Sequence, residues 1–320
     1  MPLDFSRLRA AGNDSLKKAP NATKVILLHT GVVLLISLLL SMADFLLNRE
    51  INAIEGLHGM NMRAVLLTVQ TILRLTQTIL LPFWQIGYTY FTLRVAREET
   101  AGFSDLFEGF RRFFPVLRLK ILMAFLAVGL VFISGYVGSF LFMMTPWATP
   151  LVEQLEVLAA SGMDEAALTE AIISLPNEVM LPLTVFSILC FLALAAFVFF
   201  RLRMAELWLI DHPDGDARTA LRSSRTMLKG NCLNLLKVDL GFWWFYLLEA
   251  LITAICYGDA ILAAMGIEMT MDAFGTYFLS FGLYLLLQLA LYWWKRNELS
   301  VTYAHAYLEL SPKENLDEES

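Results

Sequence analysis

Several polar side chains that could do chemistry lie inside a segment that is otherwise apolar. Gln70, Arg74 and Gln77 follow one another at steps of four and three residues, so they share one face of a helix. An arginine that faces lipid near the middle of a membrane costs roughly 2.5 kcal/mol or more, so Arg74 needs a partner inside the protein. Glu249 lies at a similar depth in a later apolar segment. We therefore predict an intramembrane polar cluster in which Arg74 and Glu249 face each other.

This cluster has two possible roles. A fixed ion pair would lock two helices in register, although both charges would leave water. A polar cavity would instead receive a substrate or a proton, as ionised groups inside transporters do. Charged residues at matching depth are compatible with either role, so both alternatives stay open.

A second group of charges forms one side of a predicted helix. The cations recur at steps of four, three and four, and small or apolar residues occupy the opposite side. The basic side is Arg218, Arg222, Arg225 and Lys229, and the other side is Ala217, Ala220, Leu221, Ser224, Met227 and Leu228. Asp214 or Asp216 is the predicted N-cap, and Gly230 supplies the left-handed residue that ends the helix.

This separation of charge predicts a helix on a bilayer surface, with its apolar side down and its cations over anionic head groups. The alternative is a solvated charged face on an ordinary surface helix. The segment from Ser104 to Phe114 has the same character, with phenylalanine and leucine at helical spacing beside Arg111 and Arg112. These two arginines join the predicted head-group contacts.

The whole chain has the composition of a membrane protein. Of its 320 residues, 58% are hydrophobic and 17% are charged, and the mean hydropathy is +0.61. Soluble domains carry about 25% charged residues. Six segments are apolar and long enough for a helix to cross a hydrocarbon core of about 30 Å. They lie at about 25–47, 64–93, 119–144, 181–210, 233–257 and 273–294.

The expected fold is an all-α, polytopic membrane helix bundle. It has six transmembrane helices, with two amphipathic surface helices on the cytoplasmic side. Polar cytoplasmic tails, 1–24 and 297–320, flank the membrane domain, 25–296. In the third span, small residues are spaced for close contact with another helix. They are Ser134, Gly135, Gly138 and Ser139.

The positions of the cations predict the topology. All Lys and Arg residues except Arg49, Arg63 and Arg74 belong to tails, loops or span ends on one side of the six spans. By the positive-inside rule that side is cytoplasmic, and both termini lie there. The first span has an alternative interpretation as a signal peptide, because Ser41-Met42-Ala43 resembles a cleavage site. The apolar run continues to Leu47, which favours a retained anchor.

Short motifs around the basic helix resemble a known family. The downstream motif is Ala220-Leu221-Arg222-Ser223-Ser224-Arg225-Thr226-Met227-Leu228-Lys229-Gly230-Asn231, followed by Leu235, Asp239, Leu240 and Phe242-Trp243-Trp244. The upstream motif is Gly87-Tyr88, Leu93, Arg97 and Asp105-Leu106-Phe107-Glu108-Gly109-Phe110. Between about Pro82 and Tyr307 the chain is thus similar to the bacterial integral membrane family called domain of unknown function 975. Gly241 departs from the family, which has Ser there.

The resemblance implies a multi-pass protein of the bacterial cell (inner) membrane with no established activity. It extends loosely to the membrane portion attached to some glycerophosphodiester phosphodiesterases. The hydrolytic barrel of those enzymes has no counterpart in this sequence.

Catalysis has little support in the sequence. There is no Gly-x-x-x-x-Gly-Lys phosphate loop, no His-Glu-x-x-His pair and no Gly-x-Ser-x-Gly elbow. Cys190, Cys232 and Cys256 are isolated and the four histidines are scattered, so we expect no metal and no cofactor. The net charge of −6 argues against a nucleic-acid partner.

Two functions therefore remain. The first is a non-enzymatic membrane accessory or organising protein whose basic helices contact membrane lipids, which we expect to be anionic. The alternative is a transporter or lipid-handling protein with a polar intramembrane cavity near Arg74. A wide cavity would favour the second function, and tightly packed, mutually satisfied polar groups would favour the first. A protein partner or a homo-oligomer is compatible with either.

Overall fold

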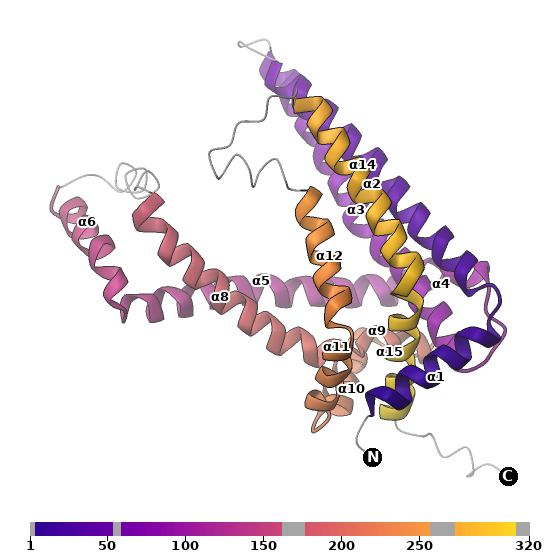
Figure 1. Ribbon diagram of the computed structural model, residues 1–320. Helices are drawn as coiled ribbons and strands as arrows, with labels where there is room; N and C mark the ends of the chain where they lie inside the picture. Colours follow the sequence, from indigo (N-terminus) through magenta and orange to yellow (C-terminus); the bar gives the residue numbers. More distant parts are fainter. Residues whose placement is uncertain (1–3, 54–58, 162–176, 257–272, 312–320) are drawn as a thin grey trace. The chain divides into compact units, whose positions relative to one another are not determined.

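The computed structural model describes residues 4–53, 59–161, 177–256 and 273–311. Within these ranges every regular element is a helix and none is a strand (Figure 1). The chain divides into two compact units, Met1–Arg118 with Met204–Ser320 and Leu119–Arg203. The described part of the chain thus confirms the predicted all-α class.

Several helices are suited to a membrane. Among the described residues, four helices are long and apolar enough to cross a bilayer, and a bent pair of helices is a fifth candidate. The four are Ala22–Ile51, Met62–Ala96, Phe113–Met143 and Met180–Asp211. The bent pair, Cys232–Gly241 and Trp243–Ile255, turns by 64° at its break. These helices correspond to the first five predicted spans.

The sixth predicted span, 273–294, falls on the helix α14 (Ala273–Leu291). The structure does not describe the side chains of residues 256–278. Among the described residues, α14 is not a candidate membrane span. The count of six spans therefore stays a prediction.

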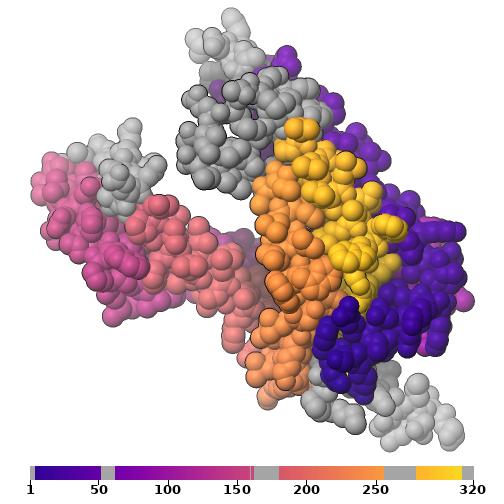
Figure 2. Space-filling model, in the orientation of Figure 1, coloured from indigo at the N-terminus to yellow at the C-terminus, as the bar shows by residue number. Residues whose placement is uncertain are grey.

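The first unit combines strongly apolar helices with more polar or shorter ones. The apolar helices are α2 (Ala22–Ala53), α3 (Gly59–Ala96), α12 (Trp243–Cys256) and α14. The other elements are α1 (Phe5–Lys18), η1 (Phe103–Phe107), α4 (Glu108–Arg111), α9 (Ala205–Asp211), α10 (Ala217–Leu228), α11 (Cys232–Gly241), η3 (Tyr292–Arg296) and α15 (Asn297–Leu310). Helix α2 packs against α3 and α12 packs against α14, as the space-filling view shows for the second pair (Figure 2).

Helix α3 has two parts with different surroundings. From Phe83 onward its apolar side chains are largely buried against other helices, whereas earlier ones such as Ile72 and Leu75 are exposed. Only 6% of the most apolar stretch of Met62–Ala96 is buried inside the protein. Because water would oppose so large an apolar surface, the first part of α3 suits a hydrocarbon environment.

The polar segments predicted as tails at both ends of the chain contain helices over most of their described residues. Helix α1 lies beside α15 in the first unit (Figure 1). Leu8 of α1 and Ala304 and Tyr307 of α15 are fully buried. The helices were not foreseen because both segments mix charged and apolar residues, which hides a narrow buried stripe in a polar average.

Charged and polar groups also join α1 to α15. Glu298 accepts hydrogen bonds from Arg9 and from Lys295, and Ser15 Oγ lies 3.0 Å from His305 Nε2. Burial alone would raise the pKa of Glu298, but the bonds from Lys295 and Arg9 outweigh burial and hold that pKa below its usual value. Burial lowers the pKa of His305, because the protein disfavours the charged imidazole.

This interface predicts a loss of stability in acid. The pKa of His305 is lower in the folded chain than in the unfolded chain, where it is near 6.5. The unfolded chain therefore takes up a proton more readily, and the folded state loses stability as pH falls below 6.5. In detergent, the melting temperature should fall between pH 7.5 and 5.5, and His305→Gln should flatten that fall. As a control, Glu298→Gln should leave it in place, because the carboxylate titrates near 4.5 when unfolded. An unchanged slope in His305→Gln would contradict the assignment.

Helix α3 and the segment after it approach each other backbone to backbone. A Cβ atom added at Gly87 would overlap the carbonyl group of Leu106, and one added at Gly109 would overlap that of Phe83. Asp105 fixes the same crossing, because Oδ1 accepts from Arg94 Nη1 at 2.8 Å and Oδ2 accepts from the Gly102 amide at 2.8 Å. The segment predicted as one amphipathic helix from Ser104 is thus a 3-10 turn, η1, and the short α4, both packed on α3.

The crossing makes a mutational prediction. Gly87→Ala should lower the yield of folded protein and its melting temperature, because backbone atoms have no room to move aside, and overpacking commonly costs about 1–3 kcal/mol or more. Gly31→Ala in α2 is the matched control, since its Cβ would meet nothing within 4 Å. That change should be neutral or slightly stabilising, because alanine favours a helix. Equal melting temperatures for the two variants would refute the close crossing.

Helices α14 and α15 form one continuous helical stretch. They are joined by η3, a single π-helical segment over Tyr292–Arg296, with helical dihedral angles at both of its flanking residues. A π turn bonds residues five apart, so it shifts the helix face that follows it. Helix α14 packs on α12 and α2, and α15 packs on α1 and α3.

The second unit is an apolar helical pair with a short helix between its members. Its elements are α5 (Phe113–Met143, of which the first residues belong to the first unit), η2 (Pro146–Ala148), α6 (Thr149–Ala160) and α8 (Asn177–Leu202). Phe142 and Leu151 form the centre of a small core. A Cβ at Gly138 would lie 2.9 Å from Ser187 Cα, so the predicted close packing is confirmed at Gly138, whereas Gly135 has open space.

Candidate functional site

The polar cluster of the sequence analysis forms between α2 and α3. Arg74 Nε and Nη2 each lie 3.0 Å from a carboxylate oxygen of Asp44, which is a two-bond fork. Gln70 also donates to Asp44, at 2.8 Å. The predicted partner of Arg74, Glu249, is not part of this group. Glu249 instead accepts a bond of 2.6 Å from the hydroxyl of Tyr292.

The hairpin formed by α2 and α3 explains the correct pairing. Residue 59 lies midway between Asp44 and Arg74, and also midway between Asn48 and Gln70. Two antiparallel helices joined near that residue must bring both pairs to the same level. The prediction compared the depths of residues in separate spans, so it did not find this pairing. The acidic residue in the neighbouring span at the same distance from the connection as Arg74 is Asp44.

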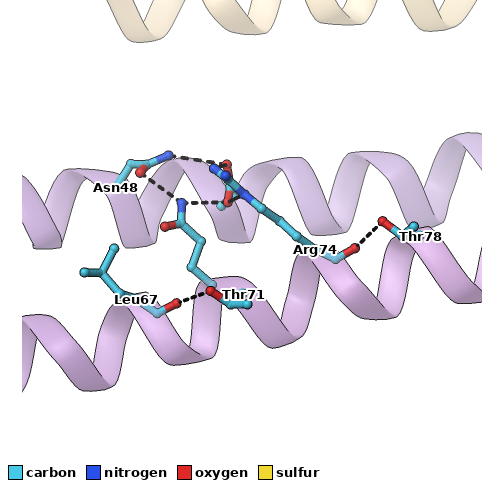
Figure 3. A network of polar contacts seen from close by, with 7 residues as sticks. Asn48, Leu67, Thr71, Arg74 and Thr78 are labelled. Atoms are coloured by element: carbon cyan, nitrogen blue, oxygen red, sulfur yellow. Dashed lines mark hydrogen bonds and ion pairs between the residues drawn. The ribbon is translucent and has the colours of Figure 1, made fainter. Parts of the chain in front are cut away.

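Amide side chains complete the coordination of Asp44. Gln70 Nε2 donates to Asn48 Oδ1 at 2.9 Å, and Asn48 Nδ2 donates to Asp44 Oδ2 at 3.3 Å. Figure 3 shows Asn48 and Arg74 reaching from the two helices toward the same point. Each oxygen of Asp44 thus accepts two bonds, which fills the roughly four acceptor positions of a carboxylate.

A groove of about 510 Å³ opens beside this ion pair. Its described lining comes from α2 and α3 alone and includes Ser41, Arg74, Gln77 and Thr78. The side chain of Arg74 remains 62% exposed, whereas that of Asp44 is 28% exposed. The pair is therefore satisfied on the side of Asp44 and accessible on the side of Arg74.

The basic helix is α10, and both of its predicted ends are confirmed. Asp216 Oδ1 accepts from the Thr219 amide at 2.8 Å, and Gly230 has a φ of +85°. The side chains of the basic face, Arg218, Arg222, Arg225 and Lys229, are all exposed. Helix α10 thus presents a continuous row of cations, set by the cap at one end and the glycine at the other.

The apolar side of α10 corrects the prediction that it rests on lipid. Ala220, Ser224 and Leu228 are fully buried, and α10 packs on α9. Ser224 Oγ accepts from the Met204 amide at 3.1 Å, at the start of α9. Protein covers the face that was expected to enter the bilayer, because periodicity shows that a helix is amphipathic but not what covers it.

The two other predicted head-group contacts, Arg111 and Arg112, differ in their exposure. Arg111 is exposed and lies 3.4 Å from Glu108. Arg112 is largely enclosed: Nη1 donates to the carbonyl groups of Leu209 at 3.3 Å and Ile210 at 2.6 Å, and Nε donates to Glu108 at 2.9 Å. Arg112 therefore caps the end of α9, and its prediction as a head-group contact is corrected.

No metal site is apparent in the described part of the chain, where no three His, Cys, Asp or Glu side chains gather. Cys190 and Cys232 are free thiols, and the side chain of Cys256 lies outside the described residues.

The long apolar helices and the polar pair between two of them define a helical protein suited to a membrane. The model of the family described as protein of unknown function (DUF975) matches residues 24–293, and the chain belongs to that family. No curated protein and no solved structure matches the chain. The looser resemblance to glycerophosphodiester phosphodiesterases gains no support from these comparisons.

The motif residues that carry the resemblance have structural tasks. Gly87 and Gly109 allow the backbone crossing at α3, and Asp105 fixes it. Ser224 joins α10 to α9, and Gly230 ends α10. These motifs therefore define the framework of the first unit, whereas the polar cluster lies on other residues.

The ion pair predicts coupled effects of mutation. Asp44→Ala and Arg74→Ala should each lower the melting temperature in detergent, and the double variant should lose less than the sum, because each single change leaves its partner unpaired. The control cycle combines Arg74→Ala with Glu249→Ala, whose effects should add, since these residues bond different partners. Additive losses for the Asp44 pair would contradict the coupling.

Proposed function

We propose that this protein is a non-enzymatic accessory or organising protein of the bacterial inner membrane, which contacts anionic lipid through the basic face of α10. The exposed row of Arg218, Arg222, Arg225 and Lys229 is the observation that carries the proposal. Each cation held near an anionic membrane surface contributes about 1 kcal/mol of attraction. The lack of catalytic motifs in the sequence supports a role without chemistry.

The way α10 is mounted supports this role. Its opposite side is buried on α9, so the helix that carries the four cations is already ordered before it binds. The attraction would be electrostatic rather than hydrophobic, and therefore sensitive to salt. This differs from a helix that floats in the interface on its own apolar side.

Tryptophan residues support the same placement of the interface. Trp243, Trp293 and Trp294 are exposed, and the rings of Trp244 and Trp294 lie 5.3 Å apart. Indole rings settle at the boundary between head groups and hydrocarbon. Helix α12 starts at Trp243 and follows α11, which follows α10, so the basic face and the aromatic group are close in sequence. With this side cytoplasmic, both termini are cytoplasmic as well.

Lipid-dependent stability tests the proposal. At low salt, phosphatidylglycerol added to the protein in detergent should raise its melting temperature more than phosphatidylcholine does. Arg218→Gln/Arg222→Gln should remove about half of that difference, because two of four similar cations are lost. Salt at about 0.5 M should reduce it in the wild type as well.

The control variant is Arg49→Gln/Arg63→Gln, which removes the same charge from exposed positions near the connection of α2 and α3. It should retain the full response to phosphatidylglycerol. A response lost equally in both variants would show that net charge, and not the face of α10, is responsible.

A second candidate function is a transporter or lipid-handling protein that uses the groove beside Arg74. The specific observation in its favour is the groove itself, because a purely structural ion pair needs no accessible arginine beside it.

A further inference from the structure

The ion pair between α2 and α3 can still donate hydrogen bonds to a ligand but can accept no more. Arg74 bonds to Asp44 through Nε and Nη2, and its Nη1 bonds nothing in the described part of the chain. Asp44 has no acceptor position left, because Arg74, Gln70 and Asn48 fill them. What the pair still offers to a ligand is therefore hydrogen-bond donors with positive charge.

Two further polar side chains line the groove beside Arg74. The hydroxyl of Ser41 and the amide of Gln77 make no hydrogen bond to the described residues, whereas Thr78 Oγ1 is bonded to the Arg74 carbonyl at 2.8 Å. Hydroxyl and amide groups both donate, as does the free edge of the guanidinium. The groove thus gathers donors from two helices around one space.

We propose that this groove binds the phosphate group of a membrane lipid, with Arg74, Ser41 and Gln77 as donors. A phosphate offers several acceptor oxygens, and a guanidinium binds it by paired, charge-assisted bonds. The volume of about 510 Å³ falls in the usual range for sites of small ligands. This inference rests on the second candidate function and names its ligand class.

The surroundings favour a lipid over free phosphate. Leu40, Phe45 and Leu73 line the groove beside its polar groups, and Leu39 and Leu75 are exposed on the same helices. Such apolar surface would accept acyl chains while the donors hold the head group. Asp44 lies three residues before Leu47, where the apolar run of α2 ends, which is about 4.5 Å along the helix, so a head group can reach it from the polar side.

Asp44 supports the donors without touching the ligand in this scheme. Its fork with Arg74 fixes the guanidinium plane and leaves the Nη1 edge toward solvent or lipid. The amides of Gln70 and Asn48 hold Asp44 in turn. A fixed arginine loses less conformational freedom on binding than a mobile one.

Native mass spectrometry of the full, delipidated protein tests the proposal. The probes are phosphatidylglycerol, diacylglycerol with the same acyl chains, and glycerol phosphate, each added at about 0.5 M salt to suppress binding at exposed cations. Phosphatidylglycerol should bind at least about ten-fold more tightly than diacylglycerol, because two or more charge-assisted bonds are at stake. Glycerol phosphate should bind weakly, since it lacks acyl chains.

Variants assign that binding to the groove. Arg74→Gln should weaken phosphatidylglycerol binding about ten-fold, and Ser41→Ala/Gln77→Ala should weaken it while keeping the ion pair. The control Arg63→Gln removes an exposed arginine of the same helix that does not line the groove, and it should bind as the wild type does. Melting temperatures show whether each variant is folded.

Three outcomes would overturn the proposal. They are equal binding of diacylglycerol, unchanged binding in Arg74→Gln, and a dimer that only Arg74→Gln dissociates, which would mean that a second copy occupies the groove. The α10 variant Arg218→Gln/Arg222→Gln separates this result from the accessory function. Loss of the low-salt lipid response in this variant, with binding at about 0.5 M salt unchanged, would assign the first effect to the basic face and the second to the groove.

Discussion

The backbone contact between α3 and the η1–α4 segment is the constraint on which the first unit depends. Because Gly87 and Gly109 lack side chains, two stretches of main chain meet where most sequences would clash. That contact, together with Asp105, fixes the buried part of α3, and α1, α9 and α15 also pack on α3. The exposed apolar part belongs to the same helix and adjoins this support. A protein framework thus positions the segment that suits hydrocarbon.

The polar cluster fills the hydrogen-bonding capacity of Asp44. Charged groups taken out of water need well-aligned bonds to offset the loss of hydration, and Asp44 receives them from three side chains. The exception is one edge of Arg74, which stays accessible beside the groove. The cluster is therefore closed on the side of Asp44 and open on the side of Arg74.

The sequence predicted those features that depend on local pattern. Apolar runs located the first five candidate spans, the Asp216 cap and Gly230 bounded α10, and the spacing of small residues located the contact at Gly138. These features follow from helix periodicity and from backbone chemistry, which neighbouring residues determine.

Features that depend on distant parts of the chain were missed. The partner of Arg74 depends on the register of a hairpin, and the cover of the apolar side of α10 depends on where α9 lies. Arg112 looked like a surface cation because nothing in its own segment shows that it meets the end of α9. The buried stripes of α1 and α15 were hidden by their polar composition.

The π-helical segment between α14 and α15 has a mechanical consequence. Because no loop interrupts Ala273–Leu310, a rotation of α14 about its axis would be passed on to α15 rather than absorbed by a flexible joint. The wider turn sets the angular offset between the two packing faces by about one residue. Because α15 packs on α1, a motion of α14 would also shift α1.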